Sequence, residues 1–163
     1  MSNEAWFAAL SSDASARWVW LRHRVERSSI ISRDASVASV DGDASSTARV
    51  VGDHFDLMFA DHPGLRTWAV DRLPGVEPQL AWLLPVHRTA YLDYQGVISG
   101  GRGEVERLAA GTFTAVEDST GFTLELNVLE TSLAEHFVGR IERLRIESSE
   151  EPTRWSIRRL RPS

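Results

Sequence analysis

Two side chains of different ligand type stand two residues apart in the stretch His54-Phe55-Asp56. In a β-strand, residues i and i+2 point to the same face, so His54 and Asp56 would face one way and Phe55 would turn into the core. An imidazole nitrogen beside a carboxylate oxygen suits a divalent transition metal better than Mg²⁺ or Ca²⁺, which prefer oxygen ligands. The spacing therefore predicts part of a metal site.

A second pair of polar side chains follows further along the chain. His87 and Tyr91 are four residues apart, so they would share a face if residues 87–94 form a short helical turn. An imidazole and a phenol on one face are groups that can hold an anion. The two pairs together predict a metal ion beside an anion site.

The elements that must position these side chains are short strands. Phe122, Leu124, Leu126 and Val128 alternate with polar residues, which indicates a half-buried strand. Turn signals recur at intervals typical of a β-barrel or sandwich. We therefore predict a mainly antiparallel all-β fold, a small closed or partly open β-barrel with one or two short helices. The predicted strands cover residues 17–22, 54–59, 65–70, 80–84, 104–108, 112–116, 122–128, 137–146 and 155–160.

One domain is expected from the length of 163 residues. It would span residues 17–163 and follow an N-terminal extension over 1–16. Residues 24–53 are rich in Ser, Asp, Ala and Val without a sustained period, and they form a long insertion that is either disordered or a mobile lid.

Composition narrows the possible functions. The chain has no cysteine, which excludes disulfides and thiolate metal sites and leaves His, Asp and Glu as metal ligands. No run of about 18 apolar residues and no signal-peptide pattern is present, so a cytoplasmic location without a membrane partner is expected. The net charge of −5 means that any contact with nucleic acid must be local. All 18 basic side chains are Arg, which suits bidentate phosphate contact, although a GC-rich genome explains this equally well.

Three separated stretches resemble the 3′-phosphoesterase domain of bacterial DNA ligase D. They are residues 54–58, 65–70 and 87–98, which carry a His-aromatic-Asp strand, a Thr-Trp-Ala-Val strand and a His with Tyr four residues later. The similarity extends to residues 111–113 and 155–158. The chain therefore resembles a divergent, stand-alone member of that family.

The resemblance implies a role for each residue. The family has a further histidine at the end of the preceding strand, and His23 fits that position, so the implied metal ligands are His23, His54 and Asp56. His87 and Tyr91 match the family's catalytic, phosphate-contacting residues. The implied metal is Mn²⁺ or another divalent transition metal.

Two features depart from the family pattern. The family usually has an Arg two residues after the Asp, where this chain has Met58, and its glycine-rich loop is shortened to residues 99–103. The candidates to replace the missing cation are Arg66, Arg88 and Arg102. A Met58→Arg change is the substitution expected to repair the anion clamp.

The activity that the resemblance implies is metal-dependent trimming of 3′ ends in DNA repair. The enzyme would remove a 3′-phosphate or a ribonucleoside from DNA or RNA–DNA primer–template ends. A separately encoded DNA ligase or polymerase is the implied protein partner.

Two other functions stay open. A catalytically degenerate domain could bind nucleic-acid ends or a repair partner, which Met58 and the acidic net charge favour. An Fe(II) oxygenase could use His54, Asp56 and His136 as metal ligands, with Arg143 or Arg145 holding a 2-oxoacid. This function would leave His87 and Tyr91 unexplained. Each residue taken alone also has a structural explanation, since a His-x-Asp pair on a strand is more often only hydrogen-bonded.

Overall fold

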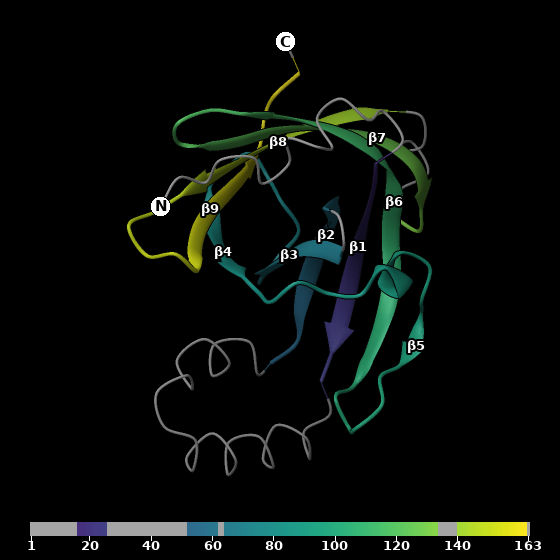
Figure 1. Cartoon of the computed structure of the whole chain (residues 1–163). Coiled ribbons are helices and arrows are strands. Elements are labelled where there is room, and N and C mark those ends of the chain that lie inside the picture. Colours follow the sequence, from purple (N-terminus) through teal and green to yellow (C-terminus); the bar gives the residue numbers. More distant parts are fainter. Residues whose placement is uncertain (1–15, 26–51, 62–63, 134–139, 163) are drawn as a thin grey trace.

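The computed structural model describes residues 16–25, 52–61, 64–133 and 140–162 (Figure 1). Almost all of the expected N-terminal extension and insertion lies outside the described residues, and so does His136. The nine described strands are β1 (Arg17–Arg24), β2 (His54–Asp61), β3 (Gly64–Val70), β4 (Gln79–Leu83), β5 (Gly96–Val97), β6 (Glu104–Glu117), β7 (Gly121–Thr131), β8 (Ile141–Ser148) and β9 (Arg154–Arg159).

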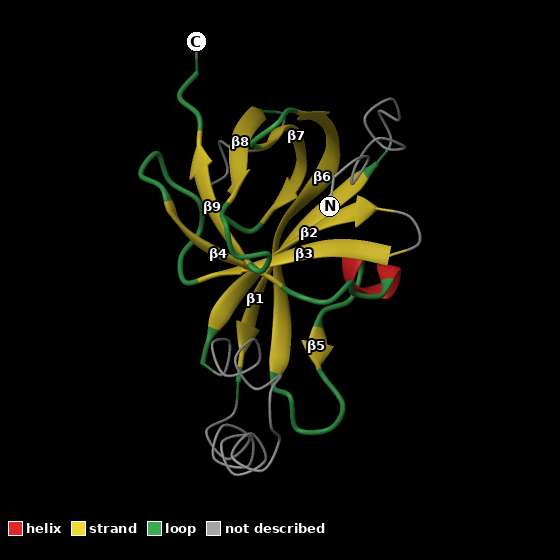
Figure 2. Cartoon of the chain, turned by 60° about the vertical axis from the view of Figure 1, so that its left-hand side comes forward, coloured by secondary structure: helices red, strands yellow, loops and turns green. Residues whose placement is uncertain are grey.

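The strands form a closed, antiparallel β-barrel, which confirms the predicted fold class. Their order is β1-β2-β3-β4-β9-β8-β7-β6, and β6 pairs back on β1 to close eight strands into a ring (Figures 1 and 2). The short β5 pairs with the first residues of β6 and lies outside the ring. In the described part of the chain the one helical element is the 3-10 turn η2 (Thr89–Leu92). It is two residues shorter at each end than the turn predicted over residues 87–94.

Strand β6 joins two segments that the sequence predicted as separate strands. Its pairing slips opposite Trp20 and Leu21 of β1, and again at Ala110 and Gly111 against β7. A side chain at Gly111 would place its Cβ 1.8 Å from the carbonyl oxygen of Asn127. Glycine therefore permits the close approach at the bulge, and the strand bends instead of ending.

The barrel interior is filled by alternate residues of every long strand. Trp18 and Trp20 of β1 and Trp68 of β3 pack there with Trp155 of β9. Trp82 of β4 is half-buried beneath the guanidinium of Arg154.

A second hydrophobic cluster lies on the outer face of β1 and β2. On β1 the outward residues are Val19 and Leu21, which alternate with the inward tryptophans, and on β2 Met58 points outward too, so that both strands offer apolar side chains on this face. The buried members of this outer cluster are Val19, Leu21, Met58, Leu65, Leu92, Ile98, Val105 and Ala110.

The segment between β4 and β5 covers this outer face. Figure 1 shows it crossing in front of the barrel toward β6. His87 forms a bridge with Leu65 of β3, and Asp93 pairs with Arg17 of β1 at 2.6 Å. These two contacts hold the segment at the start of β1 and the end of β2, whereas His23 and His54 lie at the other ends of these strands. No helix in the described ranges is both long and apolar enough to cross a membrane.

Candidate metal centre

His23, His54 and Asp56 converge on the outer face where β1 ends and β2 begins. His23 lies directly opposite His54 in the β1–β2 pair, and Asp56 lies opposite Leu21. One ligand atom from each of the three side chains lies within 4.8 Å of the other two. The alternation of the two strands therefore brings all three polar side chains to one point, while Phe55 packs toward the inner core.

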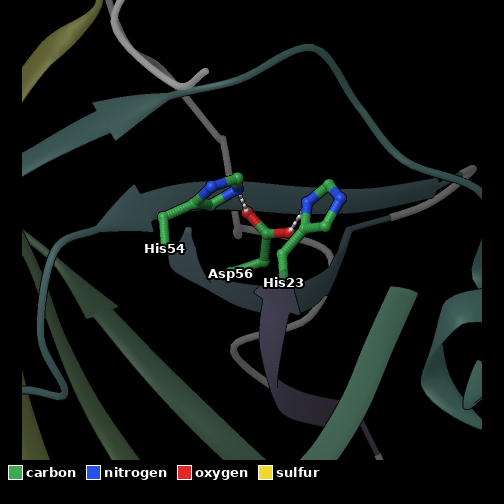
Figure 3. A group of neighbouring side chains, drawn as sticks. All are labelled: His23, His54 and Asp56. Atoms are coloured by element: carbon green, nitrogen blue, oxygen red, sulfur yellow. Dashed lines mark ion pairs between the residues drawn. The ribbon is translucent and has the colours of Figure 1, made fainter. Parts of the chain in front are cut away.

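The Asp56 carboxylate stands between the two imidazoles, with one oxygen toward each (Figure 3). Its Oδ1 lies 3.1 Å from Nε2 of His54, and its Oδ2 lies 3.5 Å from Nδ1 of His23. The Asp56 side chain is only 3% exposed and that of His54 is 7% exposed, whereas His23 retains 14%. The group is thus buried on the Asp56 side and reachable from the His23 side.

Backbone carbonyls determine which nitrogen of each imidazole carries hydrogen. His23 Nε2 donates to the carbonyl of Arg102 at 2.8 Å, and His54 Nδ1 donates to the carbonyl of Gly52 at 2.8 Å. A carbonyl oxygen only accepts, so these are the protonated nitrogens of the neutral rings. The nitrogens without hydrogen are then the two that face Asp56, Nδ1 of His23 and Nε2 of His54. In metal sites, a carbonyl that accepts the other N–H of a histidine ligand commonly orients the ring in this way.

The centre requires a positive charge beside Asp56. Burial alone would raise the pKa of the Asp56 carboxyl, but the adjacent imidazoles of His23 and His54 outweigh burial and hold that pKa well below its usual range. Burial would lower the pKa of His54, but Asp56 outweighs it and raises that pKa above its ordinary value. A proton on an imidazole or a metal ion supplies the charge.

The donor set fits a divalent transition metal. Two imidazole nitrogens and one carboxylate oxygen are ligands that Mn²⁺, Fe²⁺ and Zn²⁺ accept. With His54 neutral and its Nε2 bare, the buried Oδ1 of Asp56 has no hydrogen-bond donor, which is costly for a buried acceptor. A metal ion between the three side chains would satisfy it.

His87 and Tyr91 form a separate pair. Their rings meet edge to face with centroids 5.8 Å apart. His87 Nδ1 donates to the carbonyl of Pro85 at 2.8 Å, which leaves Nε2 as the nitrogen available to a ligand. His87 precedes η2, and only Tyr91 lies on it. The two rings therefore meet because the chain bends between them, and not because they share one helical face as predicted.

A surface pocket of about 220 Å³ lies beside Tyr91, and neither His87 nor the three candidate ligands line it. Tyr91 and Arg88 line it from one side, and Arg102 lines it from the other. The pocket reaches the candidate ligands only through Arg102, whose carbonyl accepts a hydrogen bond from His23. We call it the arginine pocket; its lining residues are Arg88, Ala90, Tyr91, Tyr94, Val97, Ile98, Ser99 and Arg102.

The third arginine candidate lies elsewhere. Arg66 follows Leu65, which belongs to the outer cluster, so alternation turns Arg66 toward the opposite face of β3. There its guanidinium binds Asp61, with Nη2 2.9 Å and Nε 3.1 Å from Oδ2. Of the three arginines that the sequence offered as phosphate ligands, the structure places Arg88 and Arg102 together and Arg66 apart.

Met58 is packed and not placed to bind an anion. It is 1% exposed within the outer cluster, near Val19, Leu21 and Leu65. An arginine at this position would bury its charge among apolar side chains. The packing therefore argues against the expectation that Met58→Arg repairs the clamp.

The sequence did not reveal the two carbonyl groups that hold the imidazoles. A backbone carbonyl has no side-chain signature, but glycines at 100, 101 and 103, all with positive φ, mark the tight loop that carries Arg102. A Cβ at Gly103 would lie 1.9 Å from the carbonyl oxygen of Arg24. Glycine is needed there for the loop to pack against β1, and this packing positions the Arg102 carbonyl.

No protein-family model matches this chain, and no curated protein matches its sequence.

Proposed function

We propose that this protein is a metal-dependent 3′-phosphoesterase similar to the end-trimming domain of DNA ligase D. It would remove a 3′-phosphate or a 3′-ribonucleoside from DNA or RNA–DNA ends. One observation carries the proposal: two imidazoles of fixed tautomer aim bare nitrogens at a buried carboxylate that has an unsatisfied oxygen. This is the arrangement that the resemblance implies for His23, His54 and Asp56.

Those three side chains would hold Mn²⁺ or a similar ion. A bound metal of this kind polarises a phosphoryl oxygen and lowers the pKa of water. His23 is the most exposed of the three ligands, so substrate and water would approach from its side. The arginine pocket lies on that side, because Arg102 belongs to both.

His87 and Tyr91 would act on the phosphate. The phenol of Tyr91 would donate a hydrogen bond to a phosphoryl oxygen and orient the group. In hydrolysis of a 3′-phosphate, the water oxygen bonds to phosphorus while the bond from phosphorus to the 3′ oxygen breaks. In its doubly protonated form, His87 would give the Nε2 proton to that leaving oxygen while its Nδ1–H stays on the Pro85 carbonyl, and the proton lost by the attacking water would return to Nε2.

A binding domain without turnover is the second candidate. Its specific support is Met58, which is buried where the family usually has a phosphate-gripping Arg. In that case the protein would hold nucleic-acid ends or a repair partner.

The test is 3′-end processing of a labelled primer–template. The substrate ends in a 3′-phosphate or a single ribonucleotide and is incubated with and without Mn²⁺. The variants are His54→Ala, His87→Ala and, as a control substitution away from the site, Asp71→Asn at an exposed loop position. Trimming that needs Mn²⁺, is lost in both histidine variants and persists in the control is the expected result.

Two other outcomes are decisive. Mn²⁺ binding that requires His54 and Asp56, without any trimming by the wild type, would establish the binding domain. Absence of both metal binding and trimming would overturn the proposal.

A further inference from the structure

We propose that the arginine pocket is a nucleotide subsite, which holds the phosphate and base next to the reacting 3′ end. The subsite rests on the proposed function in one respect, that the reacting 3′ end binds at the metal centre. The inference concerns which substrate the protein prefers: a nucleic-acid strand over a lone nucleoside phosphate.

The pocket is joined to the metal centre through one residue. The carbonyl of Arg102 accepts from His23, while the side chain of Arg102 lines the pocket. The loop around it is held by bonds from Ile98 N to the Gly103 carbonyl at 2.7 Å and from Arg102 Nε to the Ser99 carbonyl at 2.9 Å. Arg102 therefore stands between a group bound in the pocket and the candidate ligand His23.

The charge of the pocket suits a phosphate. Arg88 and Arg102 both line it, and no carboxylate does so among the residues described. Neither arginine forms an ion pair with a described carboxylate, whereas Arg17 and Arg145 each bind one closely. Arg102 uses Nε on the backbone and keeps its two terminal nitrogens for a ligand. Guanidinium groups of this kind bind phosphate oxygens in pairs.

An aromatic ring beside the arginines suits a base. Tyr94 is 41% exposed, and its hydroxyl donates to the carbonyl of Val97. The ring stands at 90° to that of Tyr91, with centroids 6.1 Å apart. With its hydroxyl engaged by the backbone, Tyr94 offers an exposed ring, and bases stack on such rings without regard to sequence.

The size of the pocket limits its occupant. A volume of about 220 Å³ is below the range of about 300–1,000 Å³ typical of drug-sized sites. The pocket is therefore too small for a longer stretch of strand and takes at most one nucleotide. Figure 2 shows η2 and β5 side by side outside the barrel, so a strand could leave the pocket without passing through the barrel. The local positive charge also reconciles nucleic-acid binding with a net charge of −5.

The test is strand binding without metal. Fluorescence anisotropy of a labelled short DNA with a 3′-phosphate is measured in EDTA, so that turnover and metal binding do not contribute. We expect Arg88→Gln and Arg102→Gln each to weaken binding about tenfold, as loss of a charged hydrogen bond does. We expect Tyr94→Ala to weaken it about tenfold through loss of stacking, and Tyr94→Phe, which keeps the ring, to bind much more tightly than Tyr94→Ala.

Arg143→Gln on β8 is the matched control, since it removes one exposed positive charge away from the pocket. It should bind DNA as the wild type does. Competition distinguishes the source of the phosphate: a 3′-phosphorylated dinucleotide should displace the DNA far better than inorganic phosphate or a 3′-phosphorylated nucleoside. Arginine-dependent binding without any trimming would leave the subsite standing and overturn the phosphoesterase. Equal binding by wild type, Arg88→Gln and Arg102→Gln, or equal competition by all three compounds, would overturn the subsite.

Discussion

His23 and His54 face each other directly across the β1–β2 pair, with ring centroids 4.7 Å apart. Each ring gives its outer N–H to a backbone carbonyl, so both bare nitrogens turn toward Asp56. The relationship makes the centre a preformed site for a cation. Separate substitutions can therefore test the metal ligands, the loop that carries the Arg102 carbonyl and the packing of the outer cluster.

Addition of Mn²⁺ should stabilise the wild type and should not stabilise an Asp56→Ala variant. A ligand at about 100 times its dissociation constant adds about 2.7 kcal/mol to the free energy of unfolding when it binds only the folded state. Thermal unfolding with Mn²⁺ and with EDTA measures the effect. Asp71→Asn should shift as the wild type does, and a shift that survives Asp56→Ala would contradict the ligand assignment.

Metal affinity should fall as the medium becomes acidic. A metal-binding imidazole must be neutral, and the pKa of His54 is raised by Asp56, so protons compete at a higher pH than for a free histidine. Affinity should be greatest above that pKa and decrease steadily from about pH 8 to about pH 5. Titration with Mn²⁺ at several pH values measures this, and a flat profile would show that the histidines are not ligands.

Replacement of Gly103 by Ala should disturb the metal centre from a distance. The new Cβ would lie 1.9 Å from the carbonyl oxygen of Arg24, so the loop must move and carry the Arg102 carbonyl away from His23. We expect weaker Mn²⁺ binding together with a loss of about 3 kcal/mol or more in stability.

Gly100→Ala is the matched control for this loop. Gly100 also has positive φ, at 77°, but its Cβ would meet nothing closer than Arg102 Nε at 4.0 Å. This variant should cost about 1–2 kcal/mol and keep the metal affinity. Equal metal affinity in both variants would show that the Arg102 carbonyl does not position His23.

Met58→Arg should destabilise the protein instead of restoring an anion clamp. Met58 is 1% exposed, and an unpaired charge at such a site costs about 3–5 kcal/mol. Met58→Leu, which keeps the volume, should cost less than about 1.5 kcal/mol. Urea unfolding of both variants decides the matter; a stable Met58→Arg protein with tighter DNA binding would return this position to the anion site.

The ion pair between Asp118 and Arg145 should make stability depend on pH at low pH only. Arg145 Nη1 lies 2.8 Å from Asp118 Oδ2, and with Thr120 it holds the pKa of Asp118 well below its usual range. A depressed folded-state pKa stabilises the fold above the unfolded pKa of about 3.9, and this contribution is lost as the pH falls further. Asp118→Asn should be less stable than the wild type at neutral pH, and the gap should narrow in acid. Urea unfolding at pH values on both sides of 3.9 measures the gap, and a constant difference would contradict the role of the pair.

The sequence alone determined the features that depend on local alternation. Trp18 and Trp20 point into the barrel because they are two residues apart on a strand, and His54 and Asp56 share the outer face for the same reason. The antiparallel barrel also followed from short alternating segments between turns. These properties are local because the side-chain period of a strand is two residues.

Tertiary structure alone decided which distant groups meet at the site. The register of β1 against β2 places His23 opposite His54, and the loop before β6 brings the Arg102 carbonyl to His23. Closure of the barrel and the crossover of the segment after β4 buried Met58 and separated Arg66 from Arg88. Strand register and chain crossings depend on packing between segments far apart in sequence, so no local pattern could fix them.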